Sequence, residues 1–340
     1  MFSMLAYVRR LIGWKDLSWI MSLGSGYVLT TFWPRKLDRW ILDRFASLLY
    51  RLDRSNVAHL AAVMEWLLAP SCGQQDWMQA ARKNYYMQLE NRWGCIRDLH
   101  RHGWEPNLEV EGLEHIRHGL AAGRGVILWG MSFGGLTLPK EAFSRLGIPL
   151  IHLSRENHGA PSKTWLGKRL GSLARMPEVR HLARRIVIPS GGSLGYMRDL
   201  MDALRANSCV SILGENTGRR DVVAPFFEVA LASAQGAPGL AWKMGSELLI
   251  CYVMREDLSD YRVVVERVPM DRALGRKAFV RAAIEHFTQR LQERIRERPA
   301  DWMMWTVTGE WWYRRRSQLA AFLPQSRDES RSLKGRSSIA

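Results

Sequence analysis

Cysteine is scarce in this sequence, and the scarcity excludes two kinds of protein. The four cysteines, Cys72, Cys95, Cys209 and Cys251, have no close spacing. A disulfide scaffold and a CxxC-type metal site are therefore both excluded. We expect the four thiols to be reduced, in a protein that faces a cytosol. No other spacing indicates a metal or a cofactor, so we expect neither.

Long hydrophobic runs are lacking as well. The best candidate is the uncharged stretch from Leu17 to Trp33, which has seventeen residues and contains Gly24, Gly26 and five serines or threonines. A membrane-spanning helix needs about 17–25 apolar residues, so this stretch is at the lower limit. No small-residue cleavage site follows it, as a signal peptide would require. We expect residues 1–36 to form a membrane anchor that spans the bilayer or lies in its interface; a buried core helix is the alternative.

Positive charge and tryptophan, in contrast, are abundant. The chain has 49 lysines and arginines against 33 acidic residues, a net charge of +16, and 15 tryptophans. A basic surface attracts nucleic acid, anionic lipid headgroups or an acidic carrier protein, whereas tryptophan settles at membrane interfaces. Together they favour an anionic membrane surface, and no nucleic-acid module is visible. We therefore expect membrane lipid and no nucleic acid as a partner. The arginines at 184–185 and 314–316 keep a nucleic-acid-binding protein as a distinct alternative.

The hydrophobic pattern divides the 340 residues into regions. Helical periodicity predicts helices over 37–52, 55–68 and 76–102, which make a helical N-terminal region of residues 37–106. After a short strand and turn at 107–114, apolar runs alternate with amphipathic helices. We expect strands over 125–129, 149–153, 185–189, 209–213, 247–254 and 261–268, and helices over 136–146, 192–205, 233–244 and 272–298.

Alternating strands and helices predict an α/β fold, with a mainly parallel sheet flanked by helices. The last two strands are joined only by residues 257–260, which favours an antiparallel pair. The Trp/Arg-rich segment 301–316 is expected either to close the core or to touch a membrane. The α/β domain would span residues 107–325, followed by a disordered Ser/Arg-rich tail at 326–340.

Ligands bind at the carboxyl ends of the strands in an open parallel sheet. Three of the expected strands run into informative segments there. These are residues 129–138 (WGMSFGGLTL), 152–159 (HLSRENHG) and 213–218 (LGENTG), the last followed by 223–227 (VAPFF).

In this order, these segments resemble the bacterial lipid A biosynthesis acyltransferases, within the lysophospholipid acyltransferase superfamily. The resemblance covers roughly residues 50–316 and also rests on 110–128, 239–256 and 293–305. It implies a membrane-bound enzyme at the cytoplasmic face of a bacterial inner membrane. This enzyme would move a fatty acyl chain from a thioester to a lipid or saccharide hydroxyl. The implied donor is acyl carrier protein or acyl-CoA, and an acidic carrier suits a +16 surface.

One departure from the family is large. The family's catalytic motif is His-x4-Asp/Glu just after the first strand, where the histidine is the general base and the acid orients it. The aligned positions here are Ser132 and Thr137, and neither can replace a base or a carboxylate at neutral pH. A literal His-x4-Glu occurs at His100 and Glu105, but it precedes the α/β region.

Three interpretations remain open. In the first, the site is rebuilt from Ser132 as nucleophile, His158 as base and Glu215 as orienting acid, with His152 a weaker alternative base because it falls inside a strand. In the second, positioning replaces the base, and the N–H groups of Gly134 and Gly135 stabilise the oxyanion. In the third, the chain is a non-catalytic relative that binds acyl-lipid or acyl carrier protein.

Further positions are candidates for binding the substrate. The resemblance implies that Arg155 and Glu215 contact it, whereas a salt bridge of Arg155 to Glu156 or Glu215 is the structural alternative. Asn157 lies in the same loop. The apolar pair at 226–227 is either core or part of a wall for the acyl chain. The expected substrate-binding residues are Arg155, Asn157, Gly134, Gly135, Phe226 and Phe227.

Overall fold

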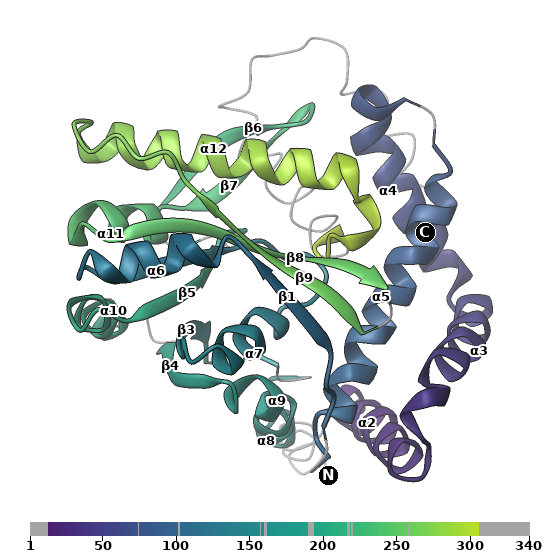
Figure 1. Ribbon diagram of the computed structural model, residues 1–340. Helices are drawn as coiled ribbons and strands as arrows, with labels where there is room; N and C mark the ends of the chain where they lie inside the picture. The colour runs from purple at the N-terminus through teal and green to yellow at the C-terminus, as the bar shows by residue number, and fades with distance from the viewer. Residues whose placement is uncertain are drawn as a thin grey trace, which may run out of the picture.

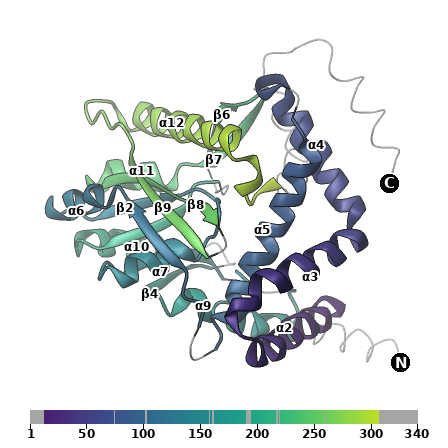
Figure 2. The ribbon, with the colours of Figure 1, turned by 45° about the vertical axis from the view of Figure 1, so that its right-hand side comes forward.

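The structure is a computed structural model in which helices cover both faces of a central sheet (Figure 1). It describes residues 13–73, 75–100, 103–156, 158–159, 162–189, 194–215, 218, 220–257 and 259–305. The helices of the N-terminal region stand together beside one end of that sheet (Figure 2).

The sheet has seven strands in the order β1-β9-β8-β2-β5-β3-β4. Strands β4, β3, β5, β2 and β8 run parallel, while β9 and β1 run the other way. The predicted α/β fold with a mainly parallel sheet is therefore confirmed, as is the antiparallel pairing of the last two strands. The strands are β1 Asn107–Glu111, β2 Val126–Gly130, β3 Leu150–Arg155, β4 Leu182–Ile188, β5 Cys209–Leu213, β8 Glu247–Asp257 and β9 Asp260–Arg267.

The central strands are apolar along their whole length because helices exclude water from both faces. In β2, Val126 to Trp129 are all buried. Helices α10, α11 and α12 pack with one face and α6 and α7 with the other. The bounds are α6 Leu113–Ala121, α7 Leu138–Arg145, α10 Gly195–Arg205, α11 Gly236–Met244 and α12 Arg276–Glu297.

Two parts of the α/β region were not predicted. Strands β6 (Asp221–Phe226) and β7 (Val229–Ala234) form a separate antiparallel pair beside α12 (Figure 1). Pro225 discourages a strand prediction, and it is exposed in a two-stranded ribbon, where the missing N–H costs little. Between β3 and β4 the chain forms α8 (Trp165–Ala174) and α9 (Met176–Val179).

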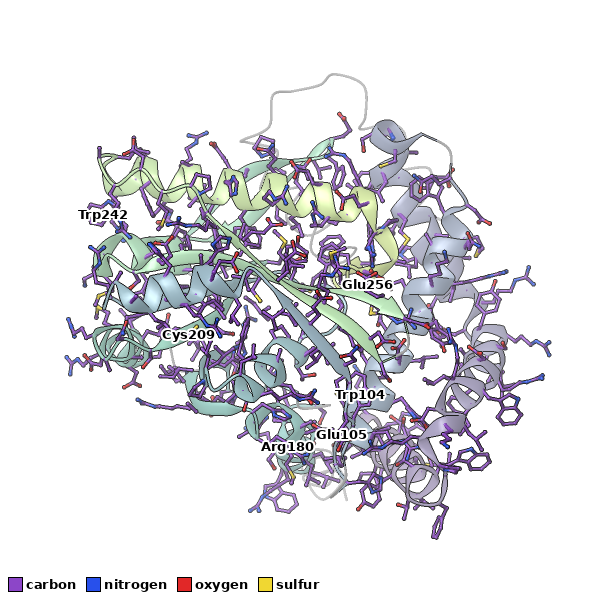
Figure 3. All side chains as sticks on the ribbon, in the orientation of Figure 1. Trp104, Glu105, Arg180, Cys209, Trp242 and Glu256 are labelled. Carbon is purple, nitrogen blue, oxygen red and sulfur yellow. The ribbon has the colours of Figure 1, made fainter. Side chains whose placement is uncertain are left out.

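Helix α5 (Trp77–Arg97) stands across the edge of the sheet at which the parallel strands end. The Glu90 carboxylate accepts a hydrogen bond from the Tyr261 hydroxyl at 2.5 Å and pairs with Arg255 at 2.6 Å. Near the same edge, the Asn84 amide donates to the carbonyl oxygens of Ala300 and Trp302, both at 2.7 Å. Glu256, near the end of β8, lies beside this helix (Figure 3). The helical N-terminal region therefore covers the end of the sheet where a site is expected.

Helix α2 (Trp14–Phe32) contains most of the uncharged stretch of the predicted anchor, and it packs in an unusual way. Residues 1–12 of that prediction lie outside the described residues. Its buried residues are Asp16, Gly26 and Thr30, so its small and polar side faces the protein. A Cβ added at Gly26 would lie 2.7 Å from a side-chain carbon of Ile96, which shows how closely α2 approaches α5. The apolar side of α2 is exposed, with Phe32 81% accessible. The alternative of a buried core helix is therefore wrong.

No helix in the part of the chain that the structure describes has the length and apolar character to cross a bilayer. The other N-terminal helices are α3 (Asp38–Leu52) and α4 (Arg54–Cys72), as predicted. The domain boundaries stay predictions.

The C-terminal segment closes the core where it is described. After a turn of 3-10 helix at Pro299–Asp301, Trp302 and Trp305 are both fully buried. The Nε1 of Trp305 donates to the carbonyl oxygen of Pro299 at 2.7 Å. Residues 306–340, which include the arginines of the Trp/Arg-rich segment and the predicted disordered tail, lie outside the described residues.

Candidate functional site

Ser132 and Glu215 meet at the carboxyl ends of β2 and β5, as the rebuilt-site hypothesis requires of them. The Ser132 N–H donates to Oε2 of Glu215 at 2.7 Å, and Nε1 of Trp302 donates to Oε1 at 2.5 Å. All three residues are buried. Burial raises the pKa of Glu215 above its usual value, although hydrogen bonds from Ser132 and Trp302 act in the opposite direction.

The segment after Pro299 lies along the loop that follows β2. The Met303 N–H donates to the carbonyl oxygen of Ser132 at 2.8 Å, and the Gly134 N–H donates to that of Asp301 at 3.0 Å. The Gly135 N–H donates to the carbonyl oxygen of Phe133 at 2.6 Å. Both glycine amides proposed for an oxyanion hole thus have acceptors within the chain, and those bonds would have to open before either amide could bind a substrate oxygen.

His158 lies against a different carboxylate. Its Nε2 is 3.4 Å from Oε2 of Glu178, a buried residue of α9. Oε1 of Glu178 is 2.8 Å from Nζ of Lys140 and 3.4 Å from Nε2 of His152. We call Lys140, His152, His158 and Glu178 the Glu178 cluster. Of the predicted triad, the structure brings together Ser132 and Glu215, and it places His158 in this second cluster.

The electrostatics of the Glu178 cluster favour an ionised carboxylate. Burial by itself would raise the pKa of Glu178, but the hydrogen bond to His158 and the charge of Lys140 outweigh it and hold the pKa well below its usual value. Burial and the same lysine lower the pKa of His152 to about 3. His152 is therefore neutral at physiological pH, and its Nδ1 lies 2.8 Å from the Ser211 hydroxyl.

The literal His-x4-Glu motif has no geometry for catalysis. The His100 ring stacks on Tyr27 with a centroid distance of 4.1 Å, and its Nε2 lies 2.7 Å from the Thr30 hydroxyl. Glu105 pairs with Arg35 at 3.1 Å. Each residue joins the segment between α5 and β1 to α2 or to the turn that follows it, and the spacing is structural.

The remaining predicted residues are divided between loop and core. Arg155 ends β3 and is exposed, and its carbonyl oxygen accepts from the His158 N–H at 3.1 Å. Asn157 lies outside the described residues. Phe226 is fully buried in the core and contacts Phe227 edge-on, with a centroid distance of 4.9 Å. Whether these side chains bind substrate stays a prediction.

Sequence reasoning missed Lys140, Glu178 and the role of Trp302 as a partner of Glu215. Lys140 lies in α7, near the segment compared with the catalytic motif, but a lysine at that position carries no signal of burial. Glu178 lies in a helix that was not predicted. Three separate elements, α7, β3 and α9, bring the cluster together, so no short spacing in the sequence could have revealed it.

A comparison with protein families identifies a family that spans both polar clusters. Residues 19–306 match the family described as bacterial lipid A biosynthesis acyltransferase, a range that includes every strand of both sheets. A search of the curated proteins finds no match. Because the match covers well over half of the chain and contains both polar clusters, this protein belongs to the bacterial lipid A biosynthesis acyltransferase family.

Proposed function

We propose that this protein transfers a fatty acyl chain from an acyl thioester to a lipid or saccharide hydroxyl at a membrane surface. Family membership supports an acyltransferase function, with an acyl donor and a lipid acceptor. The observation that carries the proposal is the family match, because it spans the sheet and all three strand ends that hold candidate residues. The cytoplasmic face of a bacterial inner membrane is the proposed location.

The exposed side of α2 supports attachment to a membrane. Trp14, Leu17, Met21, Val28 and Phe32 are all exposed. They fall at positions i, i+3, i+7, i+14 and i+18, which the helical repeat places in one stripe. A stripe of this kind with tryptophan in it suits the interface between headgroups and acyl chains. Such a helix lies on the bilayer and needs no spanning length.

A neighbouring groove extends the apolar surface. It has a volume of about 220 Å³ between α2, α3 and α5, and its lining residues are Leu29, Trp33, Trp40, Ile41, Arg44, Phe45, Leu48 and Trp93. Arg44 lies over the Trp40 ring at 5.8 Å. One cation at the edge of an apolar groove fits a lipid whose headgroup is anionic.

The transfer reaction is tested with the purified full chain in vesicles of bacterial lipid extract. Acyl carrier protein thioesters with chains from octanoyl to palmitoyl serve as donors, and acyl-CoA thioesters of the same lengths are assayed in parallel. We expect loss of thioester and a heavier lipid product by mass spectrometry. An acyl adduct on the protein that is absent from Ser132→Ala would establish a serine nucleophile. Product without an adduct would establish direct transfer.

Membrane attachment is tested by flotation with vesicles of phosphatidylethanolamine and phosphatidylglycerol. The double variant Met21→Glu/Phe32→Glu removes two apolar contacts worth about 1.5–3 kcal/mol each, so its binding should fall by more than about tenfold. Leu146→Glu is the control, since Leu146 is an exposed apolar residue just after α7 that lies outside the stripe. Equal binding by both variants would refute attachment through α2.

A non-catalytic relative is the second candidate function. The observation that favours it is the burial of Ser132 and Glu215 beneath Trp302, at the position where the family has its histidine. Carrier protein that binds without loss of thioester and without product, for every donor, would select this candidate.

A further inference from the structure

We propose that His158 is the general base of this transferase and accepts the proton of the acceptor hydroxyl, and that Glu178 positions the His158 imidazole. This inference rests on the proposed function. It assigns the task of the missing His-x4-acid motif to two residues that lie twenty positions apart in the sequence.

The first support is the asymmetry of the pair. The side chain of His158 is 41% exposed, whereas that of Glu178 is 6% exposed. A general base has to reach a substrate from solvent, while the carboxylate that orients it works best when it is fixed and shielded. The contact distance of 3.4 Å is of the kind that shortens when substrate is bound.

Other histidine–carboxylate contacts in the described residues lack this asymmetry. His115 lies beside Glu114, but that carboxylate is 73% exposed. His181 lies beside Asp98, but its side chain is only 19% exposed against 10% for Asp98, so neither side chain is accessible in the way that His158 is. The remaining contact, of His152 with the same Glu178, involves a buried imidazole.

The second support is the environment of Glu178. Lys140 is buried with it and lies 2.8 Å away, so the carboxylate stays charged without solvent. His152 is neutral and adds a polar contact without adding charge. Lys140 thus balances the charge of Glu178 when the imidazole of His158 is neutral. When His158 takes up a proton, the carboxylate next to it stabilises the new charge.

The third support is the way the backbone holds His158. Its N–H donates to the carbonyl oxygen of Arg155 at 3.1 Å, and its own carbonyl oxygen accepts from Nη1 of Arg175 at 2.5 Å. Arg175 caps the carboxyl end of α8. The backbone of His158 is therefore held from both sides, by the end of β3 and by the end of α8.

The position of α8 also points to the substrate class. Its exposed side chains include Trp165 and Leu173. The Thr164 hydroxyl that caps it lies 2.5 Å from Oδ2 of Asp16, at the start of α2. Helix α8 therefore adjoins the apolar stripe of α2, and Figure 1 shows the two helices at the same end of the molecule. An accessible base next to a membrane-binding surface fits an acceptor hydroxyl on the headgroup of a membrane lipid.

The chemical step balances without any further reactant. Because Nε2 of His158 faces Glu178, Nδ1 is the atom that takes the proton of the acceptor hydroxyl. The hydroxyl oxygen forms a bond to the thioester carbonyl carbon, and the carbon–sulfur bond breaks. The proton passes from Nδ1 to the departing thiolate, so the products are an ester and a thiol.

The test compares variants of the full chain in the vesicle assay. His158→Ala should lower kcat by about 10²- to 10⁴-fold with little change in KM, as expected for loss of a general base. Added imidazole should restore part of the activity of this variant, which a structural role for His158 would not permit. His115→Ala is the matched control, because His115 is similarly accessible and lies on α6.

Glu178 needs a readout that reports positioning. Glu178→Gln should lower kcat and move the acid limb of the pH–rate profile to lower pH, because the imidazolium loses its anion. Since Lys140 would then be buried without a partner, Lys140→Met/Glu178→Gln is the second variant, and it should show the same profile. Other charged or titratable groups also surround His158 and Glu178, and the interpretation of both pH–rate profiles has to take them into account. They are Lys140 from α7, His152 from β3, Arg175 from the end of α8, Arg185 from β4 and Cys95 from α5.

The outcomes separate this inference from the function on which it rests. If His158→Ala transfers the acyl chain within about threefold of the wild-type rate, the proposed roles of His158 and Glu178 are overturned and the proposed function stands. No transfer by the wild type with any donor overturns the proposed function and the catalytic role together. A loss in His158→Ala that imidazole does not restore, with an unmoved pH profile in both Glu178 variants, also overturns the pair.

Discussion

Replacing Lys140 by methionine tests the buried ion pair at the centre of the Glu178 cluster. The two side chains are 7% and 6% exposed, and Nζ lies 2.8 Å from Oε1. Methionine fills nearly the volume of the lysine stem, so the substitution removes the charge and leaves little cavity. Glu178 then remains buried with only His152 and His158 in ion-pair distance among the described residues, and His152 is neutral at physiological pH.

Breaking a buried pair by removing one partner costs about 3–5 kcal/mol. A typical domain is stable by only about 5–15 kcal/mol, so this would be a large share of the total. In Lys140→Met/Glu178→Gln, the glutamine keeps its polar contacts with the histidines and no charge remains. We expect that double variant to lie within about 1.5 kcal/mol of the wild type, because neutral replacements of buried pairs are well tolerated.

The assay is equilibrium unfolding in urea, followed by far-ultraviolet circular dichroism and by tryptophan fluorescence. A Lys140→Met variant that loses less than about 1 kcal/mol would show that Glu178 is not held by this lysine. A double variant as unstable as the single one would show that lost packing, and not the unpaired charge, explains the effect.

Three further predictions follow from single contacts. The folded-state pKa of Glu178 lies below its unfolded value, so its stabilising contribution is complete above about pH 4.3 and is lost as pH falls through the folded-state pKa. In acid, the unfolding free energy of Glu178→Gln should therefore fall less steeply with pH than that of the wild type. Gly134 has φ of 62°, and a Cβ added there would lie 2.7 Å from a carbonyl oxygen of β8, whereas Gly123 has φ of 71° and a Cβ added there would meet nothing within 4 Å. Urea unfolding should show a stability loss of about 1–2 kcal/mol for Gly123→Ala and a clearly larger loss for Gly134→Ala. Equal losses would contradict the close contact at Gly134. Trp302→Phe leaves Oε1 of Glu215 buried without its indole donor, so it should cost about 1–3 kcal/mol in thermal or urea unfolding, and a neutral result would show that water replaces the indole.

The two polar clusters differ in how accessible they are. Ser132, which we expect to align with the family's catalytic histidine, is joined to Glu215 under Trp302 within the core. The partly exposed histidine is on the neighbouring β3 loop, beside a carboxylate that a lysine keeps charged. The assays above decide whether that second cluster carries the reaction.

The fold class followed from the sequence because hydrophobic periodicity is a local property. Strand β5 was predicted with the bounds it has, Cys209–Leu213, and the antiparallel return of β9 followed from a link too short for a crossover. The hairpin of β6 and β7 was not predicted, since Pro225 discourages a strand in any local scale and only the two-stranded edge position permits it.

The site shows where local reasoning ends. The sequence predicted that Ser132, His158 and Glu215 could converge, because all three lie near the carboxyl ends of expected strands. Only Ser132 and Glu215 meet, at the ends of the neighbouring strands β2 and β5. It could not indicate the partner of His158, because the position of Glu178 depends on how α9 packs beside β4, within reach of His152 on β3. The outward orientation of the apolar stripe of α2 was likewise visible only in the structure, because an apolar helix face has the same sequence pattern whether it contacts a protein core or a membrane. The sequence pattern determines where helices and strands form and which residues follow the strands. Which charged groups are buried together is decided by the packing of elements that are distant in the sequence. A buried charge without a partner is costly, so the packing that is adopted gives each buried charge a partner.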